Sequence, residues 1–417
     1  MNEGARGTSD ISQIKNVLSK MVTSTKLKST AKNAIAYIAP ILGIPITLLF
    51  ISPSEYGFYA VYLALVIVIA PITTLRAEII YPSITNYSKR LTFRRIALWS
   101  SFVFIFFILI LTFIFTQFFS FKEYTAFLLP ISILFQSLSQ IRQGDAVLFK
   151  MPEKIIDSRF YQGLMLGIGQ PIAVSQWSSF EALAIVDILS RIVFLLALIK
   201  IPYEKISSVE NEDLYYLNAS DYKELFLASI AVTMNGFASQ FIIFFSALIY
   251  GSAISGAVGA AYRILSAPVR IVSQALQPYF LSEFATCLRN KQSTKEVIIN
   301  YLKLTTIVGL PLYLIICFFI RIFFDKFIPD WIESIPFIFI LAPMFLLSFI
   351  VVPISQSLPA SGRSSIQLKW EIGRLGIMAI AGTLSLHIAA YYSIGILSGI
   401  LVISYVMLAI TIVKINK

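Results

Sequence analysis

The sequence predicts an all-α polytopic membrane protein with twelve transmembrane helices. Of its 417 residues, 57% are hydrophobic and only 13% are charged, whereas soluble domains carry about 25% charged residues. The mean hydropathy is +0.81. From residue 33 onward the chain divides into apolar stretches close to the roughly 20 residues that a helix needs to cross a bilayer. These stretches are 33–53, 57–81, 96–119, 124–147, 159–178, 181–200, 224–250, 253–281, 297–323, 333–357, 366–388 and 391–413.

The connections between these stretches alternate in positive charge. One set is rich in Lys and Arg, beginning with residues 1–32 and ending with the tail 414–417. The other set contains only Lys122 and Lys326. Because the cytoplasmic loops of membrane proteins carry the excess of Lys and Arg, we predict that both termini and the basic connections are cytoplasmic.

The largest internal connection, residues 201–222, separates six stretches from six. It is rich in acidic residues, and we predict that it is a cytoplasmic linker between two six-helix bundles, 33–200 and 223–413. Two halves of the same orientation are what a parallel duplication produces. The segments 54–57 (SEYG) and 253–256 (AISG), each before the second helix of its half, provide a faint similarity in support.

The sequence lacks the common metal-binding and nucleotide-binding motifs. The sequence has one histidine, His387, which excludes the two-histidine metal motifs. It also lacks the glycine-rich loop and lysine that hold nucleotide phosphates, and its loops are too short for a soluble catalytic domain. We therefore expect no cofactor and no bound metal, and an enzyme only if the active site lies inside the membrane.

The net charge of +11 does not indicate a nucleic acid partner. Most of it lies on the basic connections, where it sets the orientation and meets the anionic head groups of membrane lipids. Membrane lipids are therefore expected partners, and nucleic acid is not.

Ionisable residues inside the stretches pose the functional question, because each costs at least about 2.5 to 3.5 kcal/mol to insert. Three oppositely charged pairs stand three or four residues apart, where side chains on one helix face can meet. They are Arg142 with Asp145, Asp187 with Arg191, and Glu371 with Arg374. Structural pairing and a functional role are both open for these six residues.

Arg263 and Arg270 differ from these pairs. They are seven residues apart on one helical face, and no acidic residue lies between positions 253 and 282. Their partner must come from another helix, from water or from substrate. Arg76 and Glu78 are only two residues apart, and a helix places such residues on nearly opposite sides.

Basic residues outnumber acidic ones inside the stretches. The basic residues there are Arg76, Arg142, Arg191, Arg263, Arg270, Lys303, Arg321 and Arg374, and the acidic residues well inside are Glu78, Asp145, Asp187 and Glu371. A cavity with this excess of about four positive charges recruits an anion. Because the planar fork of arginine suits phosphate, a ligand with two phosphates fits the surplus.

The chain resembles the multidrug/oligosaccharidyl-lipid/polysaccharide exporter superfamily, and within it the Wzx-type O-antigen and polysaccharide flippases. The resemblance covers essentially all twelve predicted helices. The segments that carry it are 39–45 (APILGIP), 50–59 (FISPSEYGFY), 74–78 (TLRAE), 262–270 (YRILSAPVR) and 274–276 (QAL). These motifs are moderately specific, because they are small and apolar residues around a few charges.

The resemblance implies two six-helix bundles of the MATE-like, parallel-repeat type around a central cationic cavity. It implies a non-enzymatic transporter of the bacterial cytoplasmic membrane that moves a polyprenyl-diphosphate-linked oligosaccharide to the outer leaflet for O-antigen, capsule or related polysaccharide synthesis. A coupling ion, H⁺ or Na⁺, and a polysaccharide polymerase are the further partners. Arg76, Arg263 and Arg270 match charged positions of the family pattern.

The candidate site follows from these two arguments. The candidate substrate-binding residues are Arg263, Arg270, Arg76, Arg191, Arg142 and Arg374, and the candidate charge partners are Glu78, Asp145, Asp187 and Glu371.

Three alternatives stay open at the level of sequence. A multidrug cation antiporter of the same superfamily would use acidic residues to bind cations, whereas the excess here is cationic. A membrane-embedded polysaccharide polymerase or glycosyltransferase would need a sizeable outer loop, whereas the longest expected here is about eight residues, 325–332. A structural membrane scaffold would leave Arg263 and Arg270 unexplained.

Overall fold

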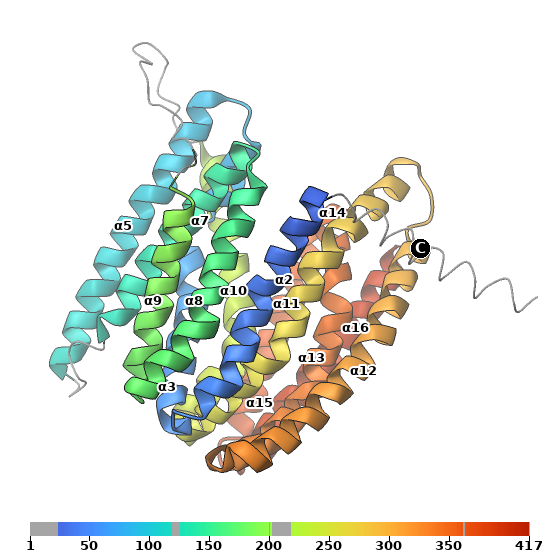
Figure 1. Ribbon diagram of the computed structural model, residues 1–417. Helices are drawn as coiled ribbons and strands as arrows, with labels where there is room; N and C mark the ends of the chain where they lie inside the picture. The colour runs from blue at the N-terminus through green and yellow to red at the C-terminus, as the bar shows by residue number, and fades with distance from the viewer. Residues whose placement is uncertain (1–23, 119–125, 200, 202–217, 362, 417) are drawn as a thin grey trace, which may run out of the picture.

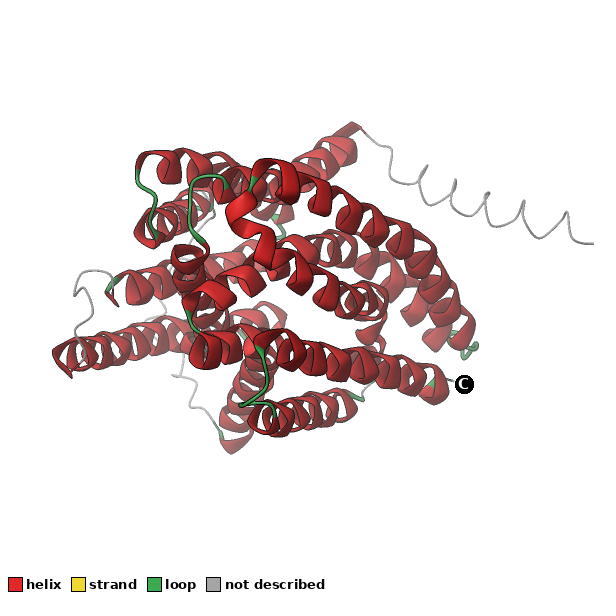
Figure 2. Cartoon of the chain, turned by 90° about the horizontal axis from the view of Figure 1, so that it is seen from below, coloured by secondary structure: helices red, strands yellow, loops and turns green. Residues whose placement is uncertain are grey.

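The computed structural model describes residues 24–118, 126–199, 201, 218–361 and 363–416. In this part of the chain Figure 2 shows helices joined by short loops and no strand. The long helices are α2 (Ser24–Leu48), α3 (Pro53–Thr73), α5 (Tyr87–Phe118), α7 (Leu128–Leu148), α8 (Pro152–Gln176), α9 (Phe180–Ala197), α10 (Ala219–Tyr250), α11 (Ser252–Arg289), α12 (Lys295–Phe327), α13 (Ile335–Ser355), α15 (Ser364–Leu384) and α16 (Ala390–Ile415). The short ones are α4 (Ala77–Ile80), α14 (Ser357–Ala360) and the 3₁₀ turns η1 (Tyr81–Ser83) and η2 (Pro329–Ser334).

The all-α membrane fold agrees with the prediction, since each of the twelve predicted stretches overlaps one long helix. In the described residues, 6 helices are long and apolar enough to cross a membrane by length and composition alone. The chain is therefore a multi-pass membrane protein. Twelve crossings remain a prediction, because the other long helices are shorter in their apolar part or carry more polar residues.

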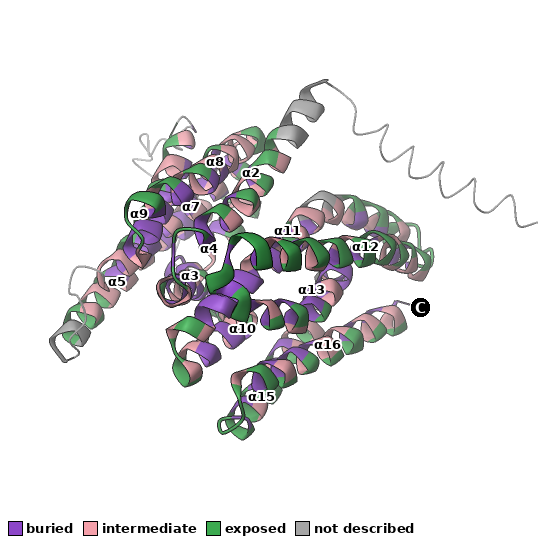
Figure 3. Ribbon diagram, turned by 60° about the horizontal axis from the view of Figure 1, so that its bottom comes forward, coloured by how far each residue is buried: buried purple, intermediate pink, exposed green. Residues whose placement is uncertain are grey.

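Apolar side chains cover the outside of the helices, as expected for a surface in contact with lipid. Trp99 and Phe106 on α5 are 70% and 65% exposed, and Ile307 on α12 is 72% exposed. Figure 3 shows exposed residues along much of α12. A soluble monomer rarely exposes apolar patches of this extent.

The helices form two groups (Figure 1). In the first bundle, α8 packs on α2 and α9, and α7 packs on α3, α5 and α9. In the second bundle, α13 packs on α11, α12 and α16, and α15 packs on α10 and α16. Helix α10 contacts α3 as well as α11, so it connects the two bundles.

The second predicted stretch, 57–81, is wrong at its far end. Helix α3 ends at Thr73, and Leu75 and Arg76 have left-handed backbone conformations with φ of 51° and 56°. Two consecutive residues in this region reverse the chain direction, since a right-handed helix cannot pass through them. The remainder of the stretch forms α4 and η1 instead.

The predicted linker 201–222 is also shorter than expected, because α10 already begins at Ala219. The Asn218 side chain accepts a hydrogen bond from the backbone N–H of Asp221, whose carboxylate accepts one from the N–H of Asn218. This capping box satisfies two free N–H groups at the start of the helix. Residues 202–217 of the linker and residues 1–23 lie outside the described part.

The two bundles touch at the end that carries the connections near Pro53 and Gly251, which we predict to face outward. The hydroxyl groups of Ser54 and Ser252 lie 2.6 Å apart, and the buried Trp331 of η2 donates a hydrogen bond of 3.1 Å from its indole N–H to the carbonyl of Ile51. We call these two links the outer contact. It closes one end of the space between the bundles.

Candidate functional site

A cavity of about 630 Å³ lies between the two bundles. Helices of both bundles line it, and five arginines but only one acidic residue are among the lining residues. The arginines are Arg159, Arg191, Arg263, Arg270 and Arg374, and the acidic residue is Asp187. Four of the six predicted substrate-binding arginines, Arg191, Arg263, Arg270 and Arg374, are therefore brought together in one cavity.

Arg263, on α11, has only neutral partners in the described part of the chain. Its Nη2 donates a 2.8 Å hydrogen bond to Gln170 Oε1, and its Nη1 donates a longer one, 3.4 Å, to the hydroxyl of Tyr56. The guanidinium also lies 5.4 Å from the ring centre of Tyr59, a cation–π distance. No carboxylate among the described residues pairs with this half-buried positive charge.

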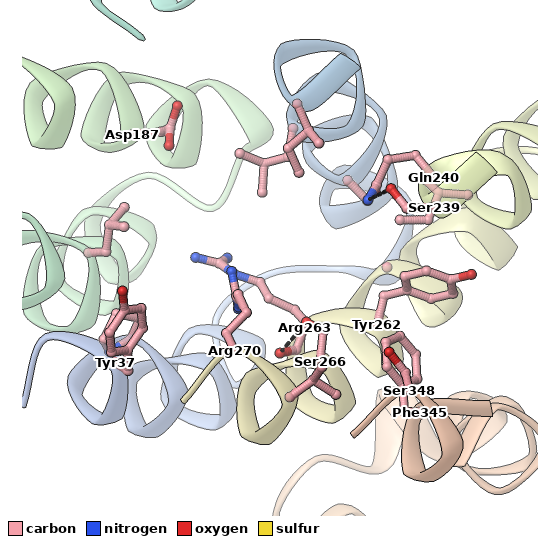
Figure 4. Close-up of a pocket in the computed structure, with 18 of the residues that line it drawn as sticks. Tyr37, Asp187, Ser239, Gln240, Tyr262, Arg263, Ser266, Arg270, Phe345 and Ser348 are labelled. Carbon is pink, nitrogen blue, oxygen red and sulfur yellow. Dashed lines mark hydrogen bonds between the residues drawn. The ribbon is translucent and has the colours of Figure 1, made fainter. Parts of the chain in front are cut away.

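Arg270 follows Arg263 by two turns of α11, which is a rise of about 10 Å along the helix. Its side chain is exposed within the cavity, and it makes no hydrogen bond or ion pair with the described residues. Figure 4 shows both arginine side chains extending into the same space. The cavity therefore holds two positive charges without a counter-charge.

Arg191 and Asp187 form the ion pair that their spacing on α9 predicts. Arg191 Nε lies 2.8 Å from Asp187 Oδ2, and Nη2 lies 3.1 Å from Oδ1. Asp187 also accepts hydrogen bonds from Tyr62 and Ser132. This bidentate pair neutralises the charge of Arg191. Arg191 therefore lines the cavity but contributes little net positive charge to it.

Arg374 and Glu371 likewise form the predicted pair on α15. The guanidinium of Arg374 stacks 4.5 Å from the ring centre of Trp370 and 5.9 Å from that of Tyr405. A carboxylate and two aromatic faces hold Arg374 in one position. It therefore adds little net charge to the cavity.

Arg142 does not line the cavity, and its placement in the substrate site is a correction to the sequence analysis. It pairs with Asp145 at 2.9 Å, as predicted, but Asp145 also binds Arg94 of α5 through two hydrogen bonds of 2.8 and 2.9 Å. Arg142 Nη2 donates to the carbonyls of Leu198 and Ile201 after α9. The cluster is buried inside the first bundle and connects α5, α7 and the segment after α9.

Arg76 is also outside the cavity, and the expectation that it faces away from Glu78 is wrong. Arg76 Nη1 lies 3.3 Å from Glu78 Oε1. The argument from spacing assumed a helix, whereas the left-handed backbone at Arg76 turns its side chain toward Glu78. This pair belongs to the break between α3 and α4.

The sequence analysis missed several residues of the cavity. Arg159 stands at the first position of the predicted stretch 159–178 and is not among the candidate site residues, but it lines the cavity and donates a hydrogen bond to the Tyr37 hydroxyl. Tyr56, Tyr59 and Gln170 carry no charge, so the search for charges inside the stretches could not find them. Their signal is the contact with Arg263 on another helix, which only the fold provides.

Comparison with solved structures reveals similarity over nearly the whole chain. An inward-facing MATE family transporter of the MOP superfamily matches with a TM-score of 0.67 at 12% identity, covering 93% of this chain and 97% of that one. The lipid II flippase MurJ, in an inward closed conformation, matches with a TM-score of 0.67 at 16% identity, covering 91% and 87%. The fold is that of MATE and MurJ transporters. Neither a protein-family model nor a curated protein sequence matches the chain.

Further solved structures of this fold match with lower TM-scores. An outward-facing MATE family transporter matches with a TM-score of only 0.56. A MOP superfamily transporter from Pyrococcus furiosus Vc1 matches with a TM-score of 0.54 at 12% identity, covering 98% and 92%, and it is described as having a binding pocket of reverse polarity that suggests a different function.

Proposed function

We propose that this protein is a flippase that moves polyprenyl-diphosphate-linked oligosaccharide units across the bacterial cytoplasmic membrane by alternating access. The observation that carries the proposal is the pair of arginines on α11, Arg263 and Arg270, which face the cavity without a carboxylate partner. A buried charge without a counter-charge is costly. An anionic ligand in the cavity removes that cost.

Phosphate suits the two arginines better than other anions do. Each guanidinium presents two parallel N–H groups to two oxygens of one phosphate, and Arg263 and Arg270 stand about two helical turns apart. A diphosphate and its first sugar have the size to reach both. Tyrosine hydroxyls and the glutamine side chains that line the same cavity, including Gln136, Gln143 and Gln162, provide hydrogen-bond partners for sugar hydroxyls.

The fold also supports a lipid-linked substrate. One structural neighbour is described as a lipid II flippase, so the fold accommodates a substrate with a lipid anchor. A cavity between two bundles that open alternately to the two sides carries the head group through the membrane, while the prenyl chain stays in lipid. The proposal also places both termini in the cytoplasm. At the outer face of the membrane, the translocated units are then substrates for a polysaccharide polymerase.

A multidrug cation antiporter is the second candidate, because two of the four structural neighbours described above are MATE family transporters. Its cavity should offer a free carboxylate to a cation. The one acidic lining residue, Asp187, is already paired with Arg191. The polarity of the cavity therefore favours the anionic substrate. A coupling ion, H⁺ or Na⁺, is compatible with either function.

Deletion of the gene tests the proposed function. We expect loss of surface polysaccharide and accumulation of complete lipid-linked units on the cytoplasmic leaflet, with recovery when the wild-type gene is returned. Return of a gene with both Arg263→Ala and Arg270→Ala should not restore the polymer. Normal surface polysaccharide in a deletion strain that has no second flippase would contradict the proposal.

A further inference from the structure

The hydrogen bonds of Arg263 connect the two bundles. Arg263 belongs to α11 of the second bundle, whereas Gln170 belongs to α8 and Tyr56 to α3 of the first. Tyr56 lies two residues after Ser54, whose hydroxyl meets that of Ser252 in the outer contact. The Tyr56 ring also packs edge-on against Trp331 of the outer contact, so the Tyr56 end of the polar link through Arg263 lies beside the outer contact.

Gln170 is built to hold Arg263 in this position. Its side chain is buried, with 2% of the residue exposed. The carbonyl end of its amide accepts from Arg263 at 2.8 Å, and the NH₂ end donates to the Tyr59 hydroxyl at 2.5 Å. Because both ends of the amide are occupied, the oxygen stays directed at the guanidinium.

A neutral amide is a modest partner for a guanidinium. The guanidinium supplies the only charge in its bonds to Gln170 and Tyr56, whereas a phosphate adds an opposite charge and can accept two parallel hydrogen bonds from one arginine. A phosphate that reaches Arg263 therefore replaces the bonds to Gln170 and Tyr56. Any separation of α11 from α3 and α8 at the outer contact must break the same bonds.

We propose that Gln170 is a positioning residue for Arg263, and that the two form a latch that holds the outer contact closed until an anionic ligand takes over the guanidinium. In the protein without ligand, the latch increases the stability of the closed outer contact. With ligand bound, the bonds across the bundles are exchanged for bonds to phosphate, and the outer end is free to open. The latch thus couples ligand binding in the cavity to the opening of the outer contact. Release of the latch by a diphosphate rests on the proposed function, whereas its stabilisation of the closed outer contact does not.

A disulfide between the two halves of the outer contact measures the closed state. The full-length protein carries Ser54→Cys and Ser252→Cys, whose hydroxyl oxygens are 2.6 Å apart, and the native cysteines are replaced through Cys287→Ser and Cys317→Ser. The rate of disulfide formation under a mild oxidant is measured in proteoliposomes with and without a sugar-free polyprenyl diphosphate. We expect fast formation without the lipid and slower formation with it.

Two substitutions of Gln170 should differ in their effect on disulfide formation. Gln170→Ala removes one bond to the charged group, and we expect the ratio of closed to open protein to fall about tenfold without any lipid. Gln170→Glu keeps the shape but gives Arg263 a charged partner, so disulfide formation should stay fast and lose its response to the lipid. A merely structural role for Gln170 predicts slower formation, or no change, in both variants.

The controls separate local from general effects. Gln176→Ala changes an exposed glutamine of the same helix, outside the cavity, and should behave as the parent protein. Tyr56→Phe removes the weaker bond of Arg263 and should give a smaller decrease than Gln170→Ala. If Gln170→Ala does not accumulate in the membrane, Tyr56→Phe and Gln170→Glu still test the latch.

The outcomes distinguish failure of the latch from failure of the proposed function. Disulfide formation at the parent rate in both Gln170→Ala and Tyr56→Phe without lipid would overturn the latch, whatever the substrate is. Slower disulfide formation in Gln170→Ala but not in Gln170→Glu, with no response of the parent protein to the polyprenyl diphosphate, would support the closed latch and refute the diphosphate as the ligand that releases it.

Discussion

Gly57 of α3 and Gly256 of α11 meet backbone to backbone at the outer contact. A Cβ atom on Gly57 would lie 1.9 Å from the carbonyl oxygen of Ser252, and one on Gly256 would lie 1.8 Å from that of Pro53. The two contacts are reciprocal, because Pro53 and Ser252 are each the first residue of the helix that carries the glycine. This reciprocity is what two related halves around an axis along the membrane normal would produce.

Gly256→Val should therefore prevent the outer contact from closing, because the new side chain would overlap the backbone of α3. We expect loss of polysaccharide export and loss of the disulfide between cysteines placed at Ser54 and Ser252. Gly376→Val is the matched control, since nothing lies within 4 Å of a Cβ atom at Gly376. Retained export and disulfide formation in Gly256→Val would show that the close contact is not required.

Arg270→Ala should reduce export of the polymer to less than about a tenth of the wild-type rate, because a charge-assisted bond contributes about 1.5 to 3 kcal/mol. Arg270→Lys keeps the charge but loses the two-pronged geometry, so we expect partial activity. Both variants should accumulate normally, because Arg270 bonds to no other described residue. Arg321→Ala, on the exposed face of α12, serves as the control. Full export by Arg270→Ala would rule out Arg270 as a phosphate ligand.

Asp145→Asn should destabilise the protein without acting through the cavity. Asp145 is 1% exposed and binds Arg94 and Arg142, so its loss leaves two buried cations without this counter-charge. Breaking a buried pair costs about 3 to 5 kcal/mol. We expect a lower melting temperature and less protein in the membrane.

A surface pair provides the comparison for Asp145. Lys32 and Asp157 form an ion pair with side chains that are 46% and 30% exposed, and such pairs contribute about 0 to 1 kcal/mol. Asp157→Asn should therefore leave the melting temperature nearly unchanged. An equal decrease in both variants would contradict the distinction between the buried cluster and the surface pair.

Labelling of single cysteines tests the orientation in the membrane. With the native cysteines replaced, Ser208→Cys in the linker should resist a membrane-impermeant thiol reagent in intact cells, because we predict that the linker is cytoplasmic. Tyr392→Cys, at an exposed position at the start of α16, should react. The reverse pattern would place the termini outside.

The local features of the fold could be read from the sequence. Apolar stretches long enough to span a bilayer predicted the long helices, and spacings of three or four residues predicted the ion pairs of Arg142, Arg191 and Arg374. These inferences hold because hydrophobic length and helical spacing involve only residues that are close in the chain. The same reasoning failed at Arg76, where the backbone leaves the helix and a short spacing brings two side chains together.

The sequence by itself therefore determined that this is an all-helical membrane protein with an excess of arginine inside its apolar stretches and no acidic residue between positions 253 and 282, around Arg263 and Arg270. Only the tertiary structure decided which arginines share a cavity and which, like Arg142, form ion pairs inside the first bundle. It also supplied Gln170 and Tyr56 as the partners of Arg263. These residues are far apart in the chain, and neutral groups carry no charge signal. Packing of the helices alone brings them within hydrogen-bond distance.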